Sequence, residues 1–367
     1  MIKKVPYIDL PGQYAARESE IREALDRVLR SGTYIQGDEV ARFEADFARL
    51  SETPHAVGVS NGTDALILAL MALDIGPGDE VITAANSWIS SASSIALVGA
   101  TPVFADVGSD YNLDPEAVAA VITARTRAIM PVHLTGLCAD MGPLLELAQQ
   151  HDLTVIEDAA QAVCSAYRGA RAGSMGAMGC FSLHPLKNLN AAGDAGIITT
   201  RDEALAQRLR LLRNHGLVSR NEVAFFGHNA RLDALQAALL NVKTPHVAEV
   251  IQQRRSHAAR YRTGLEAIVD LPVDDSKRFH TYHLFVIQCP RRDELKAYLK
   301  ENGISSAIHY PIPIHLQPAC AHLGYGQGSL PVTEAQAKRI LSLPVHHLLG
   351  DDQIDFVIER IRAFYDR

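Results

Sequence analysis

The sequence of 367 residues has little cysteine and no pair spaced as CxxC. An odd number of scattered cysteines is typical of reduced, buried thiols in a cytosolic protein, and it argues against a disulfide framework. We therefore expect a cytoplasmic protein that holds no metal ion. The cysteines are Cys138, Cys164, Cys180, Cys289 and Cys320.

Long apolar runs and long basic runs are also missing. No stretch approaches the ~20 apolar residues that span a bilayer, and the lysines at the N-terminus precede no apolar segment of signal-peptide length. The formal net charge is -7, from 35 basic and 42 acidic residues. We read the pair Arg254 and Arg255 as a solvated helix face. These features predict neither a membrane nor a nucleic-acid partner.

The chain does contain regular alternation of strand and helix patterns from about residue 20 to residue 200. Residues 55–60 (HAVGVS) read as a strand, residues 64–73 as a helix, and the turn at residues 76–78 (GPG) ends that helix. Similar short apolar strands follow in DEVITAA, TPVFADV, RAIMPVHL and LTVIEDAA. The pattern predicts an α/β fold with a mostly parallel central sheet covered by helices.

The last third of the chain has a different pattern. A long helical stretch at residues 234–263 has a predicted break at Pro245, and the strand-like segment HLFVIQC and a helix at residues 293–302 follow. We therefore predict two domains. A large domain spans residues 1–245, including the N-terminal segment, and a smaller α+β domain spans residues 246–367.

Asp158 is a candidate ligand of a cofactor. The segment VIEDAAQA, residues 155–162, places this carboxylate at the end of a buried strand. Ligands of open α/β sheets bind beyond that end of the strands. Asp158 could pair with a protonated ring nitrogen. The alternative is an N-cap of the following helix.

Lys187 lies between apolar flanks and two glycine-containing turns in residues 179–200. Partial burial would lower its pKa and leave a neutral amine that can attack a carbonyl. Ser182, which precedes it, could donate to a phosphate. The alternative for Lys187 is an exposed turn residue.

The loop SNGTDAL, residues 60–66, leads directly into a helix. Free backbone N–H groups and the positive end of the helix dipole would attract a phosphate there, with Gly62 and Thr63 at the point of contact. A plain capped helix start is the alternative. Trp88, the single tryptophan, could stack on a flat cofactor or serve ordinary packing.

Together these segments resemble the DegT/StrS family of sugar aminotransferases, which are fold-type I enzymes that use pyridoxal phosphate (PLP). The matching segments run in the expected order from residue 31 to residue 345. They are SGTYIQGDEVARFEADFA, SNGTDALILALMAL, IGPGDEVIT, GATPVFADV, MPVHLTG, VIEDAAQA, SLHPLKNL, GHNARLDALQAALL, HYPIPIHLQP and LSLPV.

The resemblance implies a role for each matched residue. Lys187 would hold the cofactor as a Schiff base and shuttle protons, and Asp158 would bind the pyridine nitrogen. Gln161 would face the cofactor ring and Trp88 would stack on it. The phosphate would be held by Gly62, Thr63 and Ser182. Asn229, in GHNARLD, would reach the phosphate of the neighbouring subunit, which implies a homodimer with shared active sites.

Two departures from the family pattern lie near the lysine. Ala195 and Gly196 replace a pair of glycines, and Leu186 stands where threonine is common. Neither change removes a group that the chemistry needs. Some relatives carry histidine in place of Lys187 and act as dehydratases, so the lysine argues for amino transfer.

The substrate prediction rests on the proline-rich segment HYPIPIHLQP, residues 309–318. It is most similar to that of aminotransferases acting on C3 of nucleotide-linked ketohexoses, with glutamate as amino donor. The candidate substrate residues are Tyr34, His184, His309, Tyr310 and His315.

Other functions remain as alternatives. A 4-keto nucleotide sugar or an aminocyclitol ketone could be the substrate, and a PLP-binding regulator is the non-enzyme alternative. Such regulators usually carry an added DNA-binding module, for which the sequence has no separate segment. A nicotinamide-dependent dehydrogenase would need a GxGxxG segment after the first strand, and the sequence has none. The base, the sugar and the aminated carbon are not fixed by the sequence.

Overall fold

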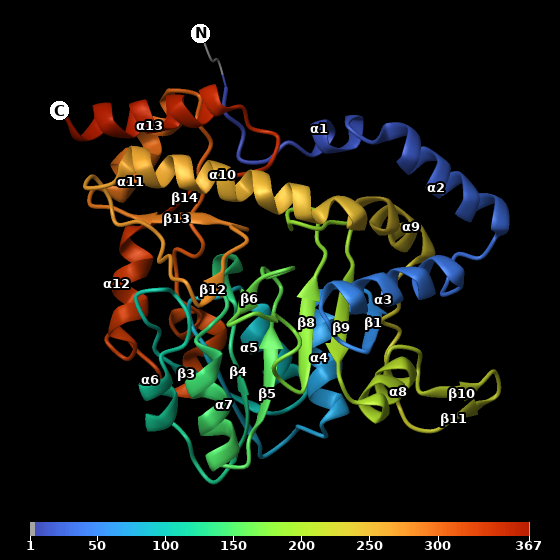
Figure 1. Cartoon of the computed structure of the whole chain (residues 1–367). Helices are drawn as coiled ribbons and strands as arrows, with labels where there is room; N and C mark the ends of the chain where they lie inside the picture. Colours follow the sequence, from blue (N-terminus) through green and yellow to red (C-terminus); the bar gives the residue numbers. More distant parts are fainter. Residues whose placement is uncertain (1–3, 367) are drawn as a thin grey trace.

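The computed structural model describes residues 4–366, and a seven-stranded sheet forms the centre of that part of the chain (Figure 1). The strand order is β1-β9-β8-β5-β4-β2-β3. In chain order the strands are β1 (His55–Val59), β2 (Glu80–Ala84), β3 (Thr101–Ala105), β4 (Thr126–Met130), β5 (Thr154–Asp158), β8 (Met178–Ser182) and β9 (Gly196–Thr200).

The sheet is mostly parallel, as predicted, but β9 runs antiparallel to both of its neighbours, β1 and β8. Residues 183–195, which join β8 to β9, contain no crossover helix, so the chain turns back beside the strand it has just left. Lys187 lies in this connection. The antiparallel strand therefore follows from the loop that carries the lysine.

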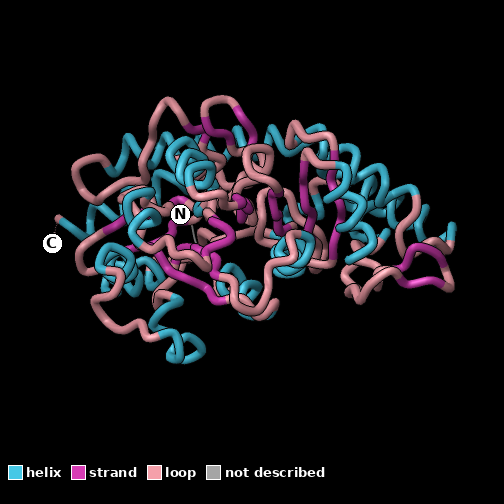
Figure 2. The backbone as a smooth tube through the Cα atoms, turned by 90° about the horizontal axis from the view of Figure 1, so that it is seen from below, coloured by secondary structure: helices cyan, strands magenta, loops and turns pink. Residues whose placement is uncertain are grey.

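Helices cover both faces of the sheet, and Figure 2 shows the strands running between them. The helix α4 is buried nearly all round, which explains why its sequence GTDALILALMA is apolar on every side. The helices of this part are α1 (Leu10–Ala15), α2 (Glu18–Ser31), α3 (Asp38–Leu50), α4 (Gly62–Ala72), α5 (Ser90–Leu97), α6 (Pro115–Ala120), α7 (Met141–Gln150), α8 (Glu203–Leu212) and α9 (Ala234–Lys243).

Two hydrophobic cores fill the space between the sheet and these helices, one on each face. Successive strand residues point to opposite faces, so Val155 joins the core around Phe43 and Phe181, whereas Ile156 joins the core around Leu66 and Leu68. The same alternation sends the side chains at the end of β5 to different faces.

The C-terminal part of the chain forms a third core. Pro245 lies in a 3-10 turn between α9 and α10, which confirms the predicted break. The elements are α10 (Val247–Leu265), β13 (Phe285–Gln288), α11 (Arg292–Glu301), α12 (Pro331–Arg339), β14 (Ile340–Leu343) and α13 (Asp351–Tyr365), with β13 and β14 antiparallel.

The chain around Val5 packs with this third core, whereas Tyr7 packs against Val132 and Leu134 of the large domain. Val5 is fully buried in the third core, its N–H donates to the carbonyl of Gly303 at 2.9 Å, and it pairs with Ile304. The domain boundary at residue 246 stays a prediction. The reading of Arg254 as a solvated residue is wrong, because that side chain is 3% exposed on the inner face of α10.

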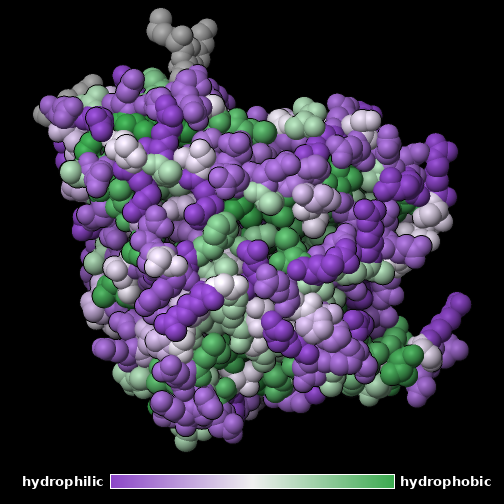
Figure 3. All heavy atoms as spheres, in the orientation of Figure 1, coloured by the Kyte–Doolittle hydropathy of each residue, from purple (hydrophilic) through white to green (hydrophobic). Residues whose placement is uncertain are grey.

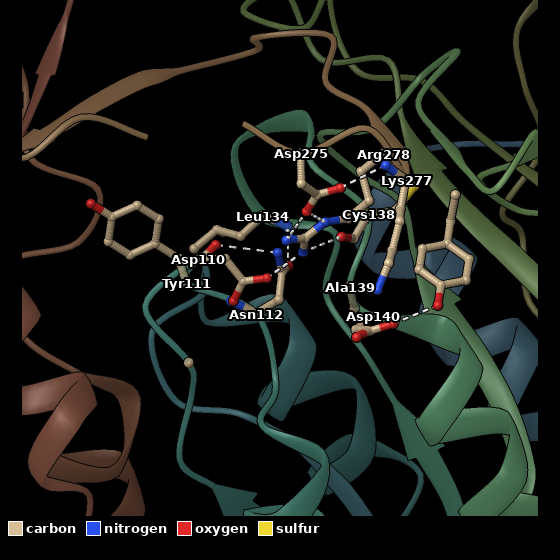
Figure 4. Close-up of polar contacts among 12 residues, drawn as sticks. Asp110, Tyr111, Asn112, Leu134, Cys138, Ala139, Asp140, Asp275, Lys277 and Arg278 are labelled. Carbon is tan, nitrogen blue, oxygen red and sulfur yellow. Dashed lines mark hydrogen bonds and ion pairs between the residues drawn. The ribbon is translucent and has the colours of Figure 1, made fainter. Parts of the chain in front are cut away.

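A cluster of charged residues ties the C-terminal part to the large domain (Figure 4). Arg278, in β12 (Arg278–Phe279), donates to Asp275 at 2.7 Å, to Asp110, and to the carbonyl of Cys138 at 3.2 Å. The strand β12 pairs with β6 (Ala166–Tyr167), which also pairs with β7 (Ala170–Arg171).

A hairpin of β10 (Leu217–Ser219) and β11 (Glu222–Val223) projects from the body of the molecule (Figures 1 and 2). No helix in residues 4–366 is long and apolar enough to cross a membrane. The cysteines, all within the described part, form no disulfide.

Candidate active site

A cavity of about 850 Å³ opens where the parallel strands end, bounded on its other side by the C-terminal part of the chain. Its floor comes from residues at or just after the ends of β2, β5 and β8, as expected for an open α/β sheet. The predicted site residues that line it are Gly62, Thr63, Trp88, Asp158, Gln161, Ser182, His184, Lys187, His309 and Tyr310.

Asp158 and Glu157 are neighbours in β5, but only Asp158 faces the cavity. Asp158 is 4% exposed, and its two oxygens accept from Ser91 Oγ at 2.8 Å and from the N–H of Ala160 at 3.2 Å. Burial raises the pKa of this carboxyl, and the two hydrogen bonds oppose the rise. A cationic group in the cavity would therefore be bound strongly.

Glu157 points to the opposite face and serves the structure. It is fully buried and pairs with His133 Nε2 at 2.9 Å. Its oxygens also accept the backbone N–H groups of Gly173, Met175 and Gly176 at 2.7–2.8 Å. These four contacts occupy the acceptor sites of the Glu157 carboxylate, so Glu157 has no role in the cavity.

Lys187 extends into the cavity from the connection between β8 and β9. Its own N–H donates to the carbonyl of His184 at 2.8 Å, which holds the loop in a turn. Burial lowers the pKa of the amine to about 8, and the nearby Asp158 carboxylate opposes part of that shift. At that pKa about a fifth of the amine is neutral near physiological pH, far more than for an ordinary lysine, and can react with a carbonyl.

The start of α4 forms a cradle against the end of β8. A Cβ atom added to Gly62 would lie 2.7 Å from Ser182 Cβ, so only glycine allows this approach. Asn61 caps the helix by accepting the N–H of Asp64 at 2.8 Å, and Thr63 Oγ1 pairs with Ser90 Oγ at 2.8 Å. The first N–H groups of α4 thus face the cavity beside two hydroxyl groups, which suits a phosphate.

Aromatic and amide groups line the next part of the cavity. The ring of Trp88 is 59% exposed and its centroid lies 5.6 Å from that of Tyr310. Gln161 accepts the N–H of Thr135 at 2.7 Å and points its amide nitrogen to the Tyr310 hydroxyl at 3.5 Å. Burial raises the pKa of Tyr310 to about 12, so this hydroxyl stays protonated and can donate.

The histidines of the cavity are neutral near pH 7. His309 Nδ1 pairs with Ser342 Oγ at 2.9 Å, and burial, followed by the charge of Lys187, lowers the pKa of His309 to about 4. Burial, followed by Lys187, also lowers the pKa of His184, whose side chain is exposed at the edge of the cavity. Neutral rings of this kind can donate or accept hydrogen bonds to sugar hydroxyls.

Three predicted site residues lie outside the cavity of their own chain. His315 is 1% exposed and pairs with Glu334 at 3.1 Å, where it holds the proline-rich loop. Tyr34 lies exposed between α2 and α3, with its hydroxyl directed to the carbonyl of Leu29 at 3.4 Å. Asn229 is exposed and pairs through its backbone with Asn214.

Several cavity residues were not found from the sequence. Ser91 supports Asp158 from the first turn of α5, yet a serine at a helix start reads as an ordinary cap. Tyr7, Arg254, His283 and His346 come from distant segments, and no local pattern marks them. Within residues 4–366 no group of histidine, cysteine, aspartate and glutamate has the arrangement of a metal site.

The residues present fit PLP. The cradle at Gly62 and Ser182 suits its phosphate, the buried Asp158 suits a protonated ring nitrogen, and Lys187 suits its aldehyde. The fold and this cavity therefore define a fold-type I PLP-dependent enzyme, and its reaction is transamination. The chain belongs to the DegT/DnrJ/EryC1/StrS aminotransferase family, which matches residues 15–362.

Relatives in this family are similar over their whole length. The chain is 44% identical to the dTDP-3-amino-3,4,6-trideoxy-alpha-D-glucose transaminase of Streptomyces venezuelae, covering 99% of this chain and 97% of that one. It is 46% identical to a pleiotropic regulatory protein of Geobacillus stearothermophilus, covering 98% of each. The crystal structure of S. venezuelae DesV with a ketimine intermediate matches with a TM-score of 0.98 over both full chains, at 44% identity.

Proposed function

We propose that this chain transfers an amino group from an amino acid, glutamate, to C3 of a nucleotide-linked keto-deoxysugar. The observation that carries the proposal is the cavity itself, where a reactive Lys187, a buried Asp158 and a phosphate cradle face one another. The Streptomyces relative, whose name describes a 3-amino sugar product on dTDP, supports the choice of carbon.

We assign the chemistry to two residues. When bound, PLP supplies an electron sink for the substrate carbon. Asp158 holds a proton at the ring nitrogen, because a buried carboxylate is stabilised by a cation in contact with it. Lys187 Nζ would take a proton from the carbon of the amino donor in one half-reaction and give a proton to the sugar carbon in the other, since an amine with a pKa near 8 can do both at neutral pH.

The other residues bind and orient. Gly62, Thr63 and Ser182 are assigned to the phosphate, and Trp88 and Gln161 to the cofactor ring. His309 and Tyr310 face the same cavity from the proline-rich loop, which fits contacts with sugar hydroxyls, and His184 lies at its edge. Trp88 and Leu186 are exposed at the mouth, where a nucleoside diphosphate has room.

We also propose a homodimer in which Asn229 and Tyr34 serve the partner's cavity. Both side chains are exposed and outside the cavity of their own chain. The hairpin of β10 and β11 carries the exposed side chains of Val218 and Val223, and Phe226, just after the hairpin, is 96% exposed. Figure 3, in the same orientation as Figure 1, shows a hydrophobic patch, coloured green, at the lower right, where the hairpin lies in Figure 1. An apolar projection of this kind is typical of a surface that another chain covers.

The two half-reactions, followed separately by the cofactor's absorbance, test the proposal. Glutamate should convert the cofactor to its amino form, and a nucleotide-linked 3-keto-6-deoxyhexose should convert it back. The free ketohexose should react far more slowly, because binding of the remote nucleotide helps orient the reacting carbon. Faster turnover of a 4-keto sugar or an aminocyclitol ketone would overturn the choice of C3.

Loop variants locate the sugar site. His309→Ala and Tyr310→Phe should slow the keto-sugar half-reaction and leave the glutamate half-reaction nearly unchanged. His322→Ala is the matched control, because His322 is exposed in the turn that follows this loop and does not line the cavity. Equal slowing of both half-reactions by His309→Ala would assign the loop to support of the cofactor.

The Geobacillus relative is named as a regulator, so a regulatory function is the second candidate. That relative has the same extent as this chain, and therefore adds no separate DNA-binding module. Turnover of the 3-keto sugar, the 4-keto sugar or the aminocyclitol ketone would favour the enzyme over the regulator.

A further inference from the structure

One end of the cavity carries a buried positive charge that nothing in the described chain balances. Arg254, in α10, lines the cavity and is 3% exposed. Its Nη1 donates to the backbone carbonyls of Tyr282 at 3.1 Å and His283 at 3.2 Å, and its Nε has no partner. It forms no ion pair with any carboxylate of residues 4–366, so neutral carbonyls alone hold the guanidinium.

The groups next to Arg254 are neutral histidines, not acids. His283 lines the cavity with an unpaired Nδ1, and His346 lines it with its ring near the carbonyl of Pro6. Lys187 and His309 line the same cavity, and so do the carboxylates of Asp64, Asp158 and Asp194, none of which forms an ion pair with Arg254. We call Arg254, His283 and His346 the basic end of the cavity. Asp9, the acid near His346, is engaged as the N-cap of α1, where it accepts the N–H of Gly12.

A guanidinium removed from water needs an anion in contact with it, because the loss of hydration otherwise goes uncompensated. The phosphate of the cofactor has its own cradle at Gly62 and Ser182, on the side of the large domain. The anion that completes the basic end therefore belongs to a substrate.

We infer that the basic end of the cavity binds a carboxylate of the amino donor, with Arg254 as the main contact. The inference rests on the proposed aminotransferase function. Two anionic groups reach this enzyme with its substrates, a carboxylate and a diphosphate. Arg254 is almost fully buried, which suits a small group on a small molecule, whereas the exposed Trp88 and Leu186 mark the end where a nucleoside diphosphate has room. A planar guanidinium also matches a carboxylate geometrically.

The experiment compares Arg254→Gln with Arg254→Lys and with Arg255→Gln in the PLP-loaded enzyme. Arg255 is the matched control, since it follows Arg254 in α10 and likewise donates to a backbone carbonyl, that of His280 at 2.7 Å, but does not line the cavity. Arg254→Gln should raise the glutamate concentration for half-maximal rate by about 10- to 100-fold, as loss of a charged hydrogen bond does. The keto-sugar half-reaction should change much less. The glutamate concentration for half-maximal rate should be intermediate in Arg254→Lys, and that of Arg255→Gln should equal that of the wild type.

Binding of glutarate gives a readout that does not depend on turnover. This dicarboxylate should raise the unfolding temperature of the wild type and of Arg255→Gln, and should not raise that of Arg254→Gln. Glutaramide, its uncharged analogue, should have no effect on the wild type. The last comparison needs no variant, so it tests whether a carboxylate binds even if Arg254→Gln does not fold, and Arg254→Lys then tests whether Arg254 is the contact.

Several results would overturn the inference. An unchanged glutamate dependence in Arg254→Gln would do so, and equal stabilisation by glutaramide and glutarate would do so as well. A variant that loses only the keto-sugar half-reaction would assign the basic end to the diphosphate. If the wild type turns over neither substrate, the proposed function fails, while glutarate binding still reports on the basic end.

Discussion

At the scale of single residues, burial sets the chemistry of the cavity in opposite directions for its two key groups. It lowers the pKa of the Lys187 amine to about 8 and raises the pKa of the Asp158 carboxyl. Both shifts favour the neutral forms. The neutral lysine amine is a nucleophile, and the charged form of the aspartate is stabilised by any cation that enters the cavity.

The first prediction concerns pH. The rate at which the apoenzyme captures PLP should rise with pH between about 7 and 10, because only the neutral Lys187 amine attacks the aldehyde. The midpoint should lie near pH 8 and not near the ordinary value of 10.5. Stopped-flow absorbance measures the rate, with Lys187→Ala as the control that captures no cofactor covalently. A midpoint near 10 would mean that the amine is well solvated.

The second prediction separates the adjacent carboxylates of β5. Asp158→Asn keeps one acceptor oxygen, for Ser91 or for the N–H of Ala160, but carries no charge to hold a proton at the ring nitrogen, so turnover should fall by about 100-fold or more. Glu157→Gln should instead lower the unfolding temperature, since Glu157 binds His133 and three backbone N–H groups. The pair is measured by steady-state rates and thermal unfolding. Near-normal turnover in Asp158→Asn would refute the assigned role.

At the scale of elements, the sequence predicted most of what the structure shows. Alternation of apolar strands with helical periods is a local signal, and so is the helix break at Pro245. The antiparallel course of β9 was not predicted, because it depends on a connection that lacks a helix and not on the strand's own residues.

The site residues also fall into those that a local sequence pattern marks and those that only the tertiary fold brings in. Asp158, Lys187 and the loop at Gly62 stand at strand ends or helix starts, where sequence patterns are informative. Arg254 was misread, because its helix was judged from the charged pair alone and not from the face that α10 buries. His315 was assigned to the substrate from its loop, although its partner Glu334 lies in another element. Contacts between distant segments leave no trace in a single sequence.

The third prediction concerns the contact between β12 and the large domain shown in Figure 4. Arg278→Met should destabilise the protein by about 3 kcal/mol, because Asp110 and Asp275 lose a largely buried cation. Denaturant unfolding measures the loss. Arg30→Gln, which breaks the exposed pair with Asp26, should have no measurable effect. Equal effects of both variants would show that burial does not strengthen the Arg278 cluster.

At the scale of the whole molecule, the proposed dimer makes each cavity depend on two chains. The residues that an isolated chain leaves outside its own cavity, Asn229 and Tyr34, are both exposed. In that arrangement separation of the subunits removes activity without unfolding either chain.

The fourth prediction uses this dependence. Lys187→Ala and Asn229→Asp chains should each be nearly inactive as pure dimers. A mixed dimer should contain one cavity with both lesions and one with neither, so mixing should restore up to about a quarter of wild-type activity by random pairing. Native mass spectrometry confirms the exchange of subunits. Proven exchange without recovery would refute the shared active site.

The pairing of Val5 with Ile304 joins the beginning of the chain to a segment near its end. During synthesis the N-terminal segment leaves the ribosome first, yet its binding partner follows roughly 15–60 s later at ~5–20 residues per second. The third core therefore cannot close while the chain is still growing, although the large sheet can already assemble. Any nascent chain that stops before Ile304 therefore leaves Val5 without its pairing partner.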